Sequence, residues 1–516
     1  MKVCQVFSDK NQVSFYIILV LEILTVIFTS IGVFPREAVL VMTGIVVFYF
    51  IFSRAEDSLI LFILSIPLFV ALPITDTFDT MANWRILLAI LFLVWFFKKG
   101  YIKKILKERF CCSLIIQIKS NLSKFVFIFL GIGVLSLMVA TNQIVGIKKL
   151  LFLINIFLLF PIIRDLAKDE RMRLKIIKAG AVVLIISLVM GYVQIISTML
   201  SPLYNFWQWW ANNVISVFYG NNLSELVKTS NTWFSYYPDS PPTLRMFSIF
   251  PDSHSFAMFI IIGLIFAVYL MLSRQQRNLG KTLIWAVIIL SFLALISSGS
   301  RGVWLSAVFP FLTAVFLLIF KKQKIFKSFL IMLIIFALSF PVSSLILSQS
   351  HQNGDDATLA FKRAKSIADL EELSVKSRMG IWKASFRSIL KYPLLGVGIG
   401  NYPIVLDEDI SAAKKGASAH NLYLDVASEM GLLGLIALLL IFWEILRKFW
   451  KNKKEIYSLI FCFFYVWLLI YNLFDVVLLN DKVLLLFMIA LGIAYANQEL
   501  RIKNHEQISI NQHSDL

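Results

Sequence analysis

Long apolar segments recur along the chain, and they constrain the fold more than any other feature of the sequence. Most contain roughly 17 to 25 residues, and at about 1.5 Å per residue a helix of that length spans the hydrocarbon core of a bilayer, about 30 Å. Charged residues make up 16% of the 516 residues, against about a quarter in soluble proteins. We therefore predict an all-α, polytopic integral membrane protein with about 12–14 transmembrane helices.

The predicted spans form two series separated by a long aromatic segment. The first series covers residues 14–33, 36–53, 57–74, 84–97, 124–140, 146–163 and 176–199. The second series covers residues 253–272, 282–298, 303–320, 328–347, 420–446, 455–475 and 483–497. The chain is thus divided into amino-terminal transmembrane helices (1–199), an aromatic outer loop (200–252), transmembrane helices with a Ser-Arg-Gly element (253–347), a long outer loop with an amphipathic helix (348–419), carboxy-terminal transmembrane helices (420–497) and a cytoplasmic tail (498–516).

Basic residues cluster between the spans and predict the orientation. The formal net charge of +18 would suggest a nucleic-acid partner for a soluble protein, but here the clusters fall on one side of the predicted membrane, at 98–104, 171–175, 321–324 and 447–454. The positive-inside rule places that side in the cytoplasm. We expect a multi-pass protein of the cytoplasmic (inner) membrane, surrounded by lipids, without a nucleic-acid partner, with both termini inside and the two long loops outside.

Neither a metal nor another cofactor is predicted. The four cysteines, Cys4, Cys111, Cys112 and Cys462, lack the spacing of a metal site. The carboxylates of Asp355-Asp356 and Asp407-Glu408-Asp409 could hold a cation, but acids in a polar loop are ordinarily solvated.

Aromatic residues gather in the outer loop 200–252. They are Trp207, Trp209, Trp210, Trp233, Tyr236 and Tyr237. Because such side chains suit the headgroup level of a membrane, we expect this loop to form an interfacial cap.

Two arginines on the predicted outer side are candidates for chemistry. Arg301 lies in the run Ser300-Arg301-Gly302, whose small neighbours allow an anion to approach closely. Arg245 precedes a span whose entry carries His254. Two guanidinium groups suit a diphosphate, because each can bind phosphate oxygens with two hydrogen bonds. Either arginine could instead be an anchor at the membrane surface.

A histidine is the third candidate. His420 and Asn421 lie at the outer end of a predicted span, and Gly431 and Gly434 fall near the His420 direction on an α-helix. A stripe of small residues predicts close packing of a second helix, with the imidazole at its outer mouth. An isolated histidine at this place could simply cap the helix.

Two acids on the same span, Asp425 and Glu429, point away from the His420 direction. Acids in such a position usually face a partner or a wet cavity. The sequence does not identify that partner.

The loop before the histidine contains an amphipathic segment. Its apolar residues recur at helical spacing and are Ile381, Trp382, Phe386, Ile389 and Leu390. We expect a helix that lies on the membrane or covers a cavity. Tyr392-Pro393 ends it, and Gly396, Gly398 and Gly400 form a flexible turn before Asn401.

These residues together resemble the O-antigen ligase and polymerase superfamily of membrane glycosyltransferases. The likeness lies in the histidine signature of His420, Asn421, Gly431 and Gly434. It extends to the arginine element Ser300-Arg301-Gly302 and to a loop helix and glycine turn that carry Arg378, Trp382, Gly396, Gly398 and Asn401. It is densest from Arg245 to Gly434, and it does not distinguish between members of the superfamily.

The resemblance implies a donor, a mechanism and a cellular role. The donor would be a glycan on a polyprenyl diphosphate such as undecaprenyl diphosphate, transferred without metal and with inversion during synthesis of cell-envelope polysaccharide. His420 would be the catalytic base, and Arg301, Arg245 and Arg378 would bind the diphosphate. The acceptor hydroxyl stays open: a lipid core, as in lipopolysaccharide ligation, a growing glycan or a protein.

Two functions of other classes fit the same composition. A lipid-linked oligosaccharide flippase or exporter would also need many helices, but its charges should lie near the membrane midplane rather than at the outer ends. A non-catalytic membrane partner of cell-surface polysaccharide assembly would bind the donor without turning it over. Replacing His420 distinguishes that partner from an enzyme.

Overall fold

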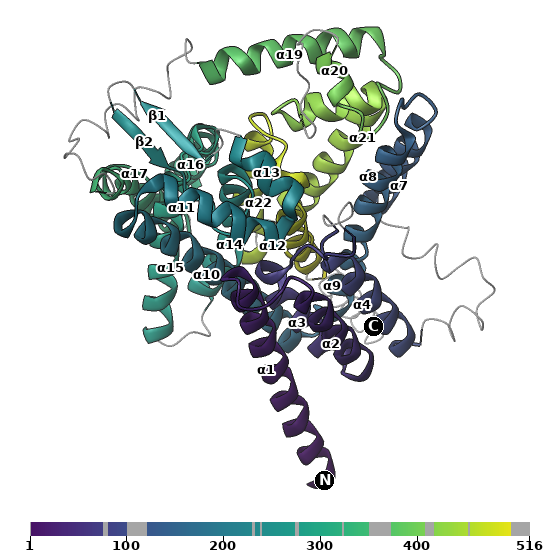
Figure 1. Cartoon of the computed structure of the whole chain (residues 1–516), viewed down its shortest axis with the longest axis vertical. Helices are drawn as coiled ribbons and strands as arrows, with labels where there is room; N and C mark the ends of the chain where they lie inside the picture. The colour runs from purple at the N-terminus through teal and green to yellow at the C-terminus, as the bar shows by residue number, and fades with distance from the viewer. Residues whose placement is uncertain are drawn as a thin grey trace, which may run out of the picture.

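The computed structural model describes residues 2–75, 81–100, 121–229, 233–237, 240–273, 278–321, 325–349, 373–407, 417–452 and 455–496. Most of these residues are helical, with one two-stranded sheet among them. In this part of the chain, 7 helices are long and apolar enough to cross a membrane, and shorter apolar helices accompany them. The prediction of an all-α polytopic membrane protein is confirmed (Figure 1).

The amino-terminal part of the chain forms a series of helices. They are α1 (Lys2–Ser30), α2 (Ala38–Phe52), α3 (Ala55–Leu64), the 3₁₀ helix η1 (Ile66–Leu68), α4 (Trp84–Lys98), α7 (Asn121–Ser136), α8 (Gln143–Phe157), α9 (Leu159–Leu166) and α10 (Glu170–Leu200). Each predicted span of this part overlaps at least one of these helices, and the span 146–163 is shared between α8 and α9.

The predicted span 57–74 is wrong as one continuous helix. Pro67 falls in η1, and proline cannot continue α-helical hydrogen bonding because it lacks an N–H. The chain beyond it is extended and buried. Its backbone finds partners within the protein: the Lys482 ammonium donates to the Phe69 carbonyl at 2.9 Å. Non-helical backbone within an apolar bundle requires such partners.

The segment between α10 and the next long helix folds into short helices and a hairpin. These are α11 (Leu203–Trp210), the π-helical turn η2 (Ala211–Ile215), α12 (Ser216–Tyr219), α13 (Asn221–Thr229), β1 (Phe234–Tyr237) and β2 (Ser240–Leu244). The two strands are antiparallel, with Phe234 opposite Leu244.

The expected interfacial cap of aromatic residues is only partly present. Trp209 and Tyr236 are exposed, by 45% and 55%. Trp210 and Trp233 are instead buried, and Trp233 stacks on Phe247 with ring centroids 4.2 Å apart. The buried tryptophans form a local core that fixes the hairpin beside the bundle, because flat aromatic contacts bury large areas.

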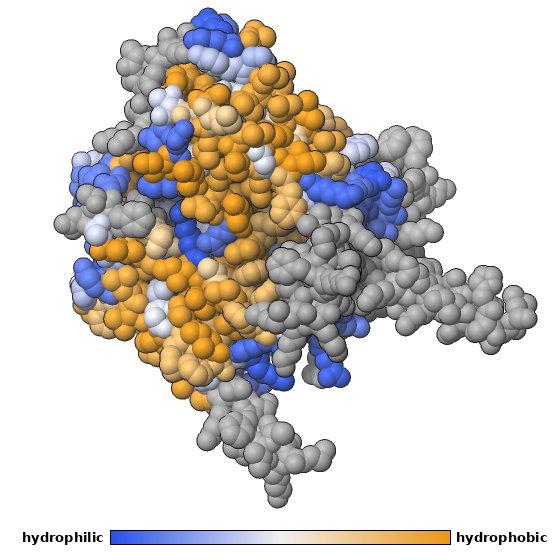
Figure 2. All heavy atoms as spheres, turned by 90° about the vertical axis from the view of Figure 1, so that its right-hand side faces the viewer, coloured by the Kyte–Doolittle hydropathy of each residue, from blue (hydrophilic) through white to orange (hydrophobic). Residues whose placement is uncertain are grey.

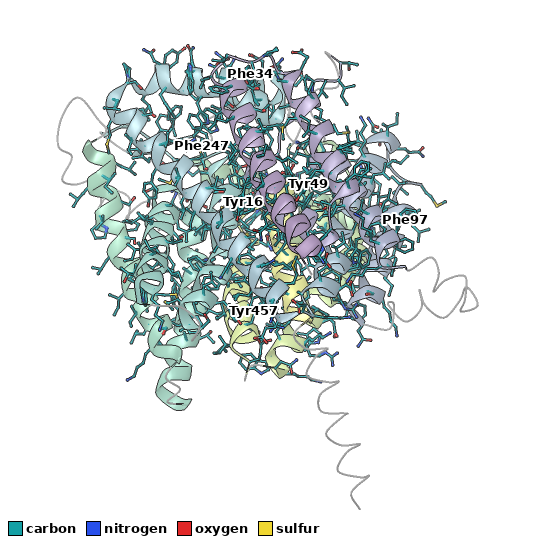
Figure 3. The ribbon with its side chains drawn as sticks, turned by 90° about the horizontal axis from the view of Figure 1, so that it is seen from below. Tyr16, Phe34, Tyr49, Phe97, Phe247 and Tyr457 are labelled. Atoms are coloured by element: carbon teal, nitrogen blue, oxygen red, sulfur yellow. The ribbon has the colours of Figure 1, made fainter. Side chains whose placement is uncertain are left out.

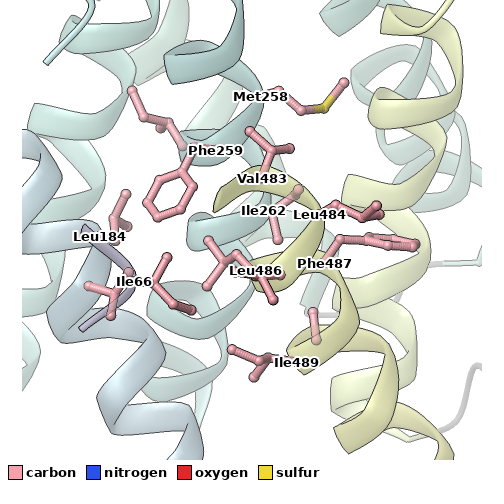
Figure 4. Packing of buried hydrophobic residues seen from close by; sticks show 14 of the residues in the cluster. Ile66, Leu184, Met258, Phe259, Ile262, Val483, Leu484, Leu486, Phe487 and Ile489 are labelled. Atoms are coloured by element: carbon pink, nitrogen blue, oxygen red, sulfur yellow. The ribbon is translucent and has the colours of Figure 1, made fainter. Parts of the chain in front are cut away.

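The carboxy-terminal helices include α14, the most buried of the 7 candidate membrane spans. They are α14 (Ser253–Leu272), α15 (Asn278–Ser297), α16 (Arg301–Lys321), α17 (Ile325–Gln349), α19 (Leu373–Lys391), α20 (Pro403–Asp407), α21 (Leu422–Lys451), α22 (Ile456–Tyr471), the 3₁₀ helix η3 (Val477–Leu479) and a last helix over 481–496. Helix α14 contacts α10, α15 and α22. Its Phe259 and Ile262 are fully buried against Leu184 of α10 and Leu486 of the last helix (Figure 4).

The surface of the bundle is largely apolar. One side shows broad hydrophobic areas with hydrophilic atoms in a hollow between them (Figure 2). Tyr16 and Phe97 are exposed, whereas Phe247 and Tyr457 are buried among the helices (Figure 3). An extended apolar exterior suits contact with lipid chains.

Helix α21 is interrupted at Gly431, where the backbone has φ 67° and ψ −172°. A Cβ there would overlap the Leu394 carbonyl, and the Leu432 N–H donates to the Pro393 carbonyl at 2.8 Å. The partner at this glycine is therefore the turn after α19 rather than a second helix, and the helix that packs closely on α21 is α7. Gly434 contacts Met430 of its own helix instead.

The glycine turn after α19 is tied to α21 by backbone hydrogen bonds. The N–H groups of Val397 and Gly398 donate to the carbonyls of Ser428 and Glu429, each at 2.9 Å. Gly396 has φ 65°, and a Cβ there would overlap the Ser428 carbonyl. The predicted turn is present, and it is docked rather than free.

Candidate functional site

His420 lies just before α21, in a left-handed backbone conformation with φ 46°. Positive φ is uncommon outside glycine, so the surrounding contacts must hold it. The Asn421 side chain caps α21 by accepting from two N–H groups of its first turn. The Leu422 N–H donates to the Asn472 carbonyl at 2.8 Å. These bonds place the histidine beside the segment that follows α22.

Helix α19 supports the same turn. It crosses one end of the bundle close to α21 (Figure 1). The Trp382 indole N–H donates to the Ala419 carbonyl at 3.0 Å, which fixes the residue before His420. Asn401 lies farther off and exchanges hydrogen bonds with the backbone of Asn142 at 2.8 and 3.2 Å. Trp382 and Asn401 therefore position the loop.

Asp475 lies between two histidines. Its Oδ1 is 3.5 Å from Nδ1 of His420, and its Oδ2 is 3.6 Å from Nδ1 of His254. Both contacts are slightly longer than a normal hydrogen bond. The Asp475 side chain is only 8% exposed, and a buried carboxylate needs positive or hydrogen-bonding partners. The two rings provide them.

A hydroxyl network links His254 of α14 to the turn before α16 and to the end of α22. Nδ1 of His254 is 2.8 Å from the Ser300 hydroxyl, which is 2.9 Å from the Tyr471 hydroxyl. The Tyr471 hydroxyl is also 3.3 Å from Nδ1 of His254. Gly302 packs on Phe474, since a Cβ at this glycine would be 2.7 Å from the Phe474 Cβ. The Ser-Arg-Gly element therefore lies against the segment that carries Asp475.

The arginines gather around this network. The Arg245 Nε–H donates to the Ser235 hydroxyl at 2.9 Å, and Gly299 packs on the Arg245 side chain. Arg245 and Arg378 are both close enough for their charges to act on His254. Arg301 is partly buried and begins α16, directly after the networked serine. Arg245 and Arg378 thus lie near the histidines, and Arg301 is the residue after Ser300.

Burial and neighbouring charges have opposing effects on the pKa values of His420 and Asp475. Burial alone would lower the pKa of His420, but the Asp475 carboxylate outweighs burial and raises that pKa from its ordinary value. Burial alone would raise the pKa of Asp475, but His254, His420 and Arg378 hold it well below its usual range. Asp475 is therefore a carboxylate at neutral pH. Because it faces Nδ1, the neutral His420 ring keeps its proton there and has Nε2 as the proton acceptor.

The site offers acid–base and anion-binding groups. Among the described residues, His, Cys, Asp and Glu side chains form no group of three suited to a metal ion. Asp355, Asp356, Glu408 and Asp409 lie outside the described residues. The arrangement can accept a proton at His420 and bind an anion with arginines a short distance away.

A comparison with known families supports the resemblance seen in the sequence. Residues 285–439 match the O-antigen ligase family. That segment of the chain is therefore similar to the O-antigen ligase superfamily. No curated protein matches the chain. The O-antigen ligase domain carries Arg301, Arg378 and His420, whereas Arg245, His254, Tyr471 and Asp475 come from elements on either side of it.

Two members of the cluster were not predicted from the sequence. Tyr471 and Asp475 follow an apolar span and carry no motif of their own. An acid at the end of the span 455–475, on the same predicted side as His420, was a usable signal. His254 stands at the entry of its predicted span, but no pattern in the sequence around it assigns it to the site.

Proposed function

We propose that the protein transfers a glycan from a polyprenyl diphosphate to an acceptor hydroxyl, on the outer face of the cytoplasmic membrane and without a metal. One observation carries this proposal. The His420 imidazole, a partly exposed base with Asp475 at its Nδ1, lies in the same cluster as Arg245 and Arg378. A base beside fixed cations suits a reaction that removes a proton and releases a diphosphate.

His420 would act on the acceptor. Nε2 takes the proton of the acceptor hydroxyl while the hydroxyl oxygen attacks the anomeric carbon of the donor sugar. The bond from that carbon to the phosphate oxygen breaks, and its electron pair leaves with the polyprenyl diphosphate. Attack opposite the leaving group inverts the anomeric carbon, and the proton passes from the imidazolium to solvent.

The arginines would act on the donor. Arg245, Arg301 and Arg378 hold the diphosphate and stabilise the negative charge that grows on it as the bond breaks. Guanidinium groups stay charged at any physiological pH, so this stabilisation does not depend on proton transfer. Replacing Arg378 or Arg301 with Gln is expected to weaken donor binding or to slow release of the diphosphate.

The test is transfer by the purified full-length protein, from a polyprenyl-diphosphate oligosaccharide, in detergent and with a chelator present. Candidate acceptors are a lipid-linked saccharide, a second donor molecule and a serine-containing peptide. His420→Ala should lower the transfer rate about 10²–10⁴-fold and leave donor binding unchanged. Lys383→Ala, at an exposed position on α19, is the matched control and should keep the wild-type rate.

Several results would overturn the proposal. One is donor binding without product from any acceptor, which a flippase or a binding protein would show. Another is a transfer rate of His420→Ala that equals the rate of the wild type. Loss of activity in chelator, restored by a divalent cation, would overturn metal independence. Product size resolves the acceptor, because a ladder indicates polymerisation and one added glycan indicates ligation or transfer to protein.

A further inference from the structure

A cavity of about 820 Å³, with several charged residues in its lining, lies beside the His420 turn. Its volume is within the range of small-molecule sites, about 300–1,000 Å³. Ser418 lines it two residues from His420, and Val476 lines it next to Asp475. Of the residues that the structure describes, Arg245 and the hydroxyl network are not part of its lining. His420 and Asp475 do not line the cavity themselves, so it lies next to that pair and apart from the arginine cluster.

The acids of this cavity already have partners. Lys149 of α8 is 2.6 Å from Oε2 of Glu429 and 3.8 Å from Oδ2 of Asp425. The other oxygen of Asp425 accepts from the Ala419 N–H at 3.1 Å. This cluster identifies the partner of the two acids on α21, and it ties α8 to the residue before His420.

Two further cations line the cavity. Arg85, at the start of α4, lies over the rings of Trp84 and Phe152, each at 5.7 Å. Its Nε is buried and makes no hydrogen bond with the described residues. The charge of Asp481 acts on it, but that carboxylate accepts from the Trp84 indole N–H at 2.9 Å. Arg85 thus retains hydrogen-bonding capacity for a ligand.

Lys148 adds an exposed ammonium to the same wall. Asn142, which caps the amino terminus of α8, also lines the cavity, so the positive end of that helix dipole faces it. Asp425 and Glu429 already pair with Lys149. The other charged groups of this wall, Arg85 and Lys148, are positive and therefore favour an anion.

We propose that this cavity binds the acceptor glycan and selects one that carries an acidic group, a carboxylate or a phosphate, held by Arg85 and Lys148. This inference rests on the proposed function. Two substrates must meet at His420: the donor diphosphate occupies the arginine cluster, and the acceptor approaches from the cavity. An acidic group on Arg85 and Lys148 then fixes which hydroxyl reaches Nε2 of His420.

The experiment measures binding of three soluble trisaccharides of equal length to the full-length His420→Ala variant, so that no turnover is needed. One probe carries a hexuronic acid, one a phosphorylated hexose, and one neither. Each acidic probe should bind about tenfold more tightly than the neutral probe. Arg85→Gln and Lys148→Gln should each reduce that preference, whereas Lys383→Gln, outside the cavity, should retain it. The tighter of the two acidic probes identifies the preferred acid.

Equal binding of all three probes would overturn the inference, as would an acid preference that survives in both variants. Because Lys148 is exposed, Lys148→Gln provides an answer even where Arg85→Gln impairs folding. A failure of the proposed function is distinguishable, because it appears as absent transfer by the wild-type protein, whereas acid-selective binding is measured without transfer. In a transfer assay, the two variants should raise the KM for an acidic acceptor and leave donor binding unchanged.

Discussion

At His420, a single carboxylate decides what the imidazole can do. Asp475 lies 3.5 Å from Nδ1 and raises the histidine pKa against the opposing effect of burial. The same carboxylate lies 3.6 Å from His254, which is bound to Ser300 and Tyr471. A change at Asp475 therefore alters the base directly and the neighbouring network indirectly.

Asp475→Asn should shift the pH dependence of transfer to lower pH and reduce the maximal rate at least about tenfold. The base form of His420 is needed, and its population rises with pH through the histidine pKa. Removing the carboxylate charge lowers that pKa, so the variant reaches its plateau at lower pH, but with a weaker and less well oriented base. The measurement is a pH–rate profile beside that of Lys383→Gln. An unchanged profile would show that Asp475 has only a structural role.

Among the helices and strands, α21 positions more of the candidate site than any other element. Asn421 caps it, His420 precedes it, and the break at Gly431 receives the turn that follows α19. Along α21, the two acids that pair with Lys149 fall between the Asn421 cap and the break at Gly431. One interrupted helix thus connects the loop helix, the base and the bundle.

Gly431→Ala should destabilise the protein by at least about 2 kcal/mol and lower transfer activity. A side chain there would take a strained φ and displace the backbone at Leu394, which would loosen α19 above His420. Thermal unfolding in detergent and the transfer rate are the readouts. The matched control is Gly380→Ala in α19, where a Cβ meets nothing within 4 Å; it should be neutral or stabilise by up to about 1 kcal/mol. Similar results for both variants would contradict the role assigned to the break.

Across the whole molecule, the candidate site and the basic residues near Arg447 lie at opposite ends of α21. Helix α21 begins beside His420 and ends in Arg447, Lys448 and Lys451. If those residues are cytoplasmic, as the positive-inside rule predicts, the site faces outward. Both substrates of the proposed reaction would then be lipid-linked or exported molecules on the outer face.

Single cysteines test this orientation. In a variant whose four native cysteines are replaced with Ala, Lys383→Cys should react with a membrane-impermeant maleimide added to intact cells or spheroplasts. Lys451→Cys, at the other end of α21, should react only after the membrane is permeabilised. The reverse pattern would place the site in the cytoplasm and contradict the proposed topology, whatever the transfer activity in detergent.

Much of the architecture and part of the site were accessible from the sequence. The overlap of predicted spans with helices follows from the length of apolar segments, which is a property of consecutive residues. Arg301 and His420 stood out because charged and polar groups are costly near a membrane. The span 57–74 failed since Pro67 breaks a segment that is apolar enough to be helical.

The sequence alone determined the fold class, the amphipathic helix now seen as α19, and three of the groups that gather at the site: Arg245, Arg301 and His420. Tertiary structure decided their partners. Asp475 meets His420 because α21 packs beside α22. Lys149 meets Glu429 because its long side chain reaches from α8 to α21. Contacts of this kind depend on how distant helices approach one another, and no local pattern of residues encodes that approach.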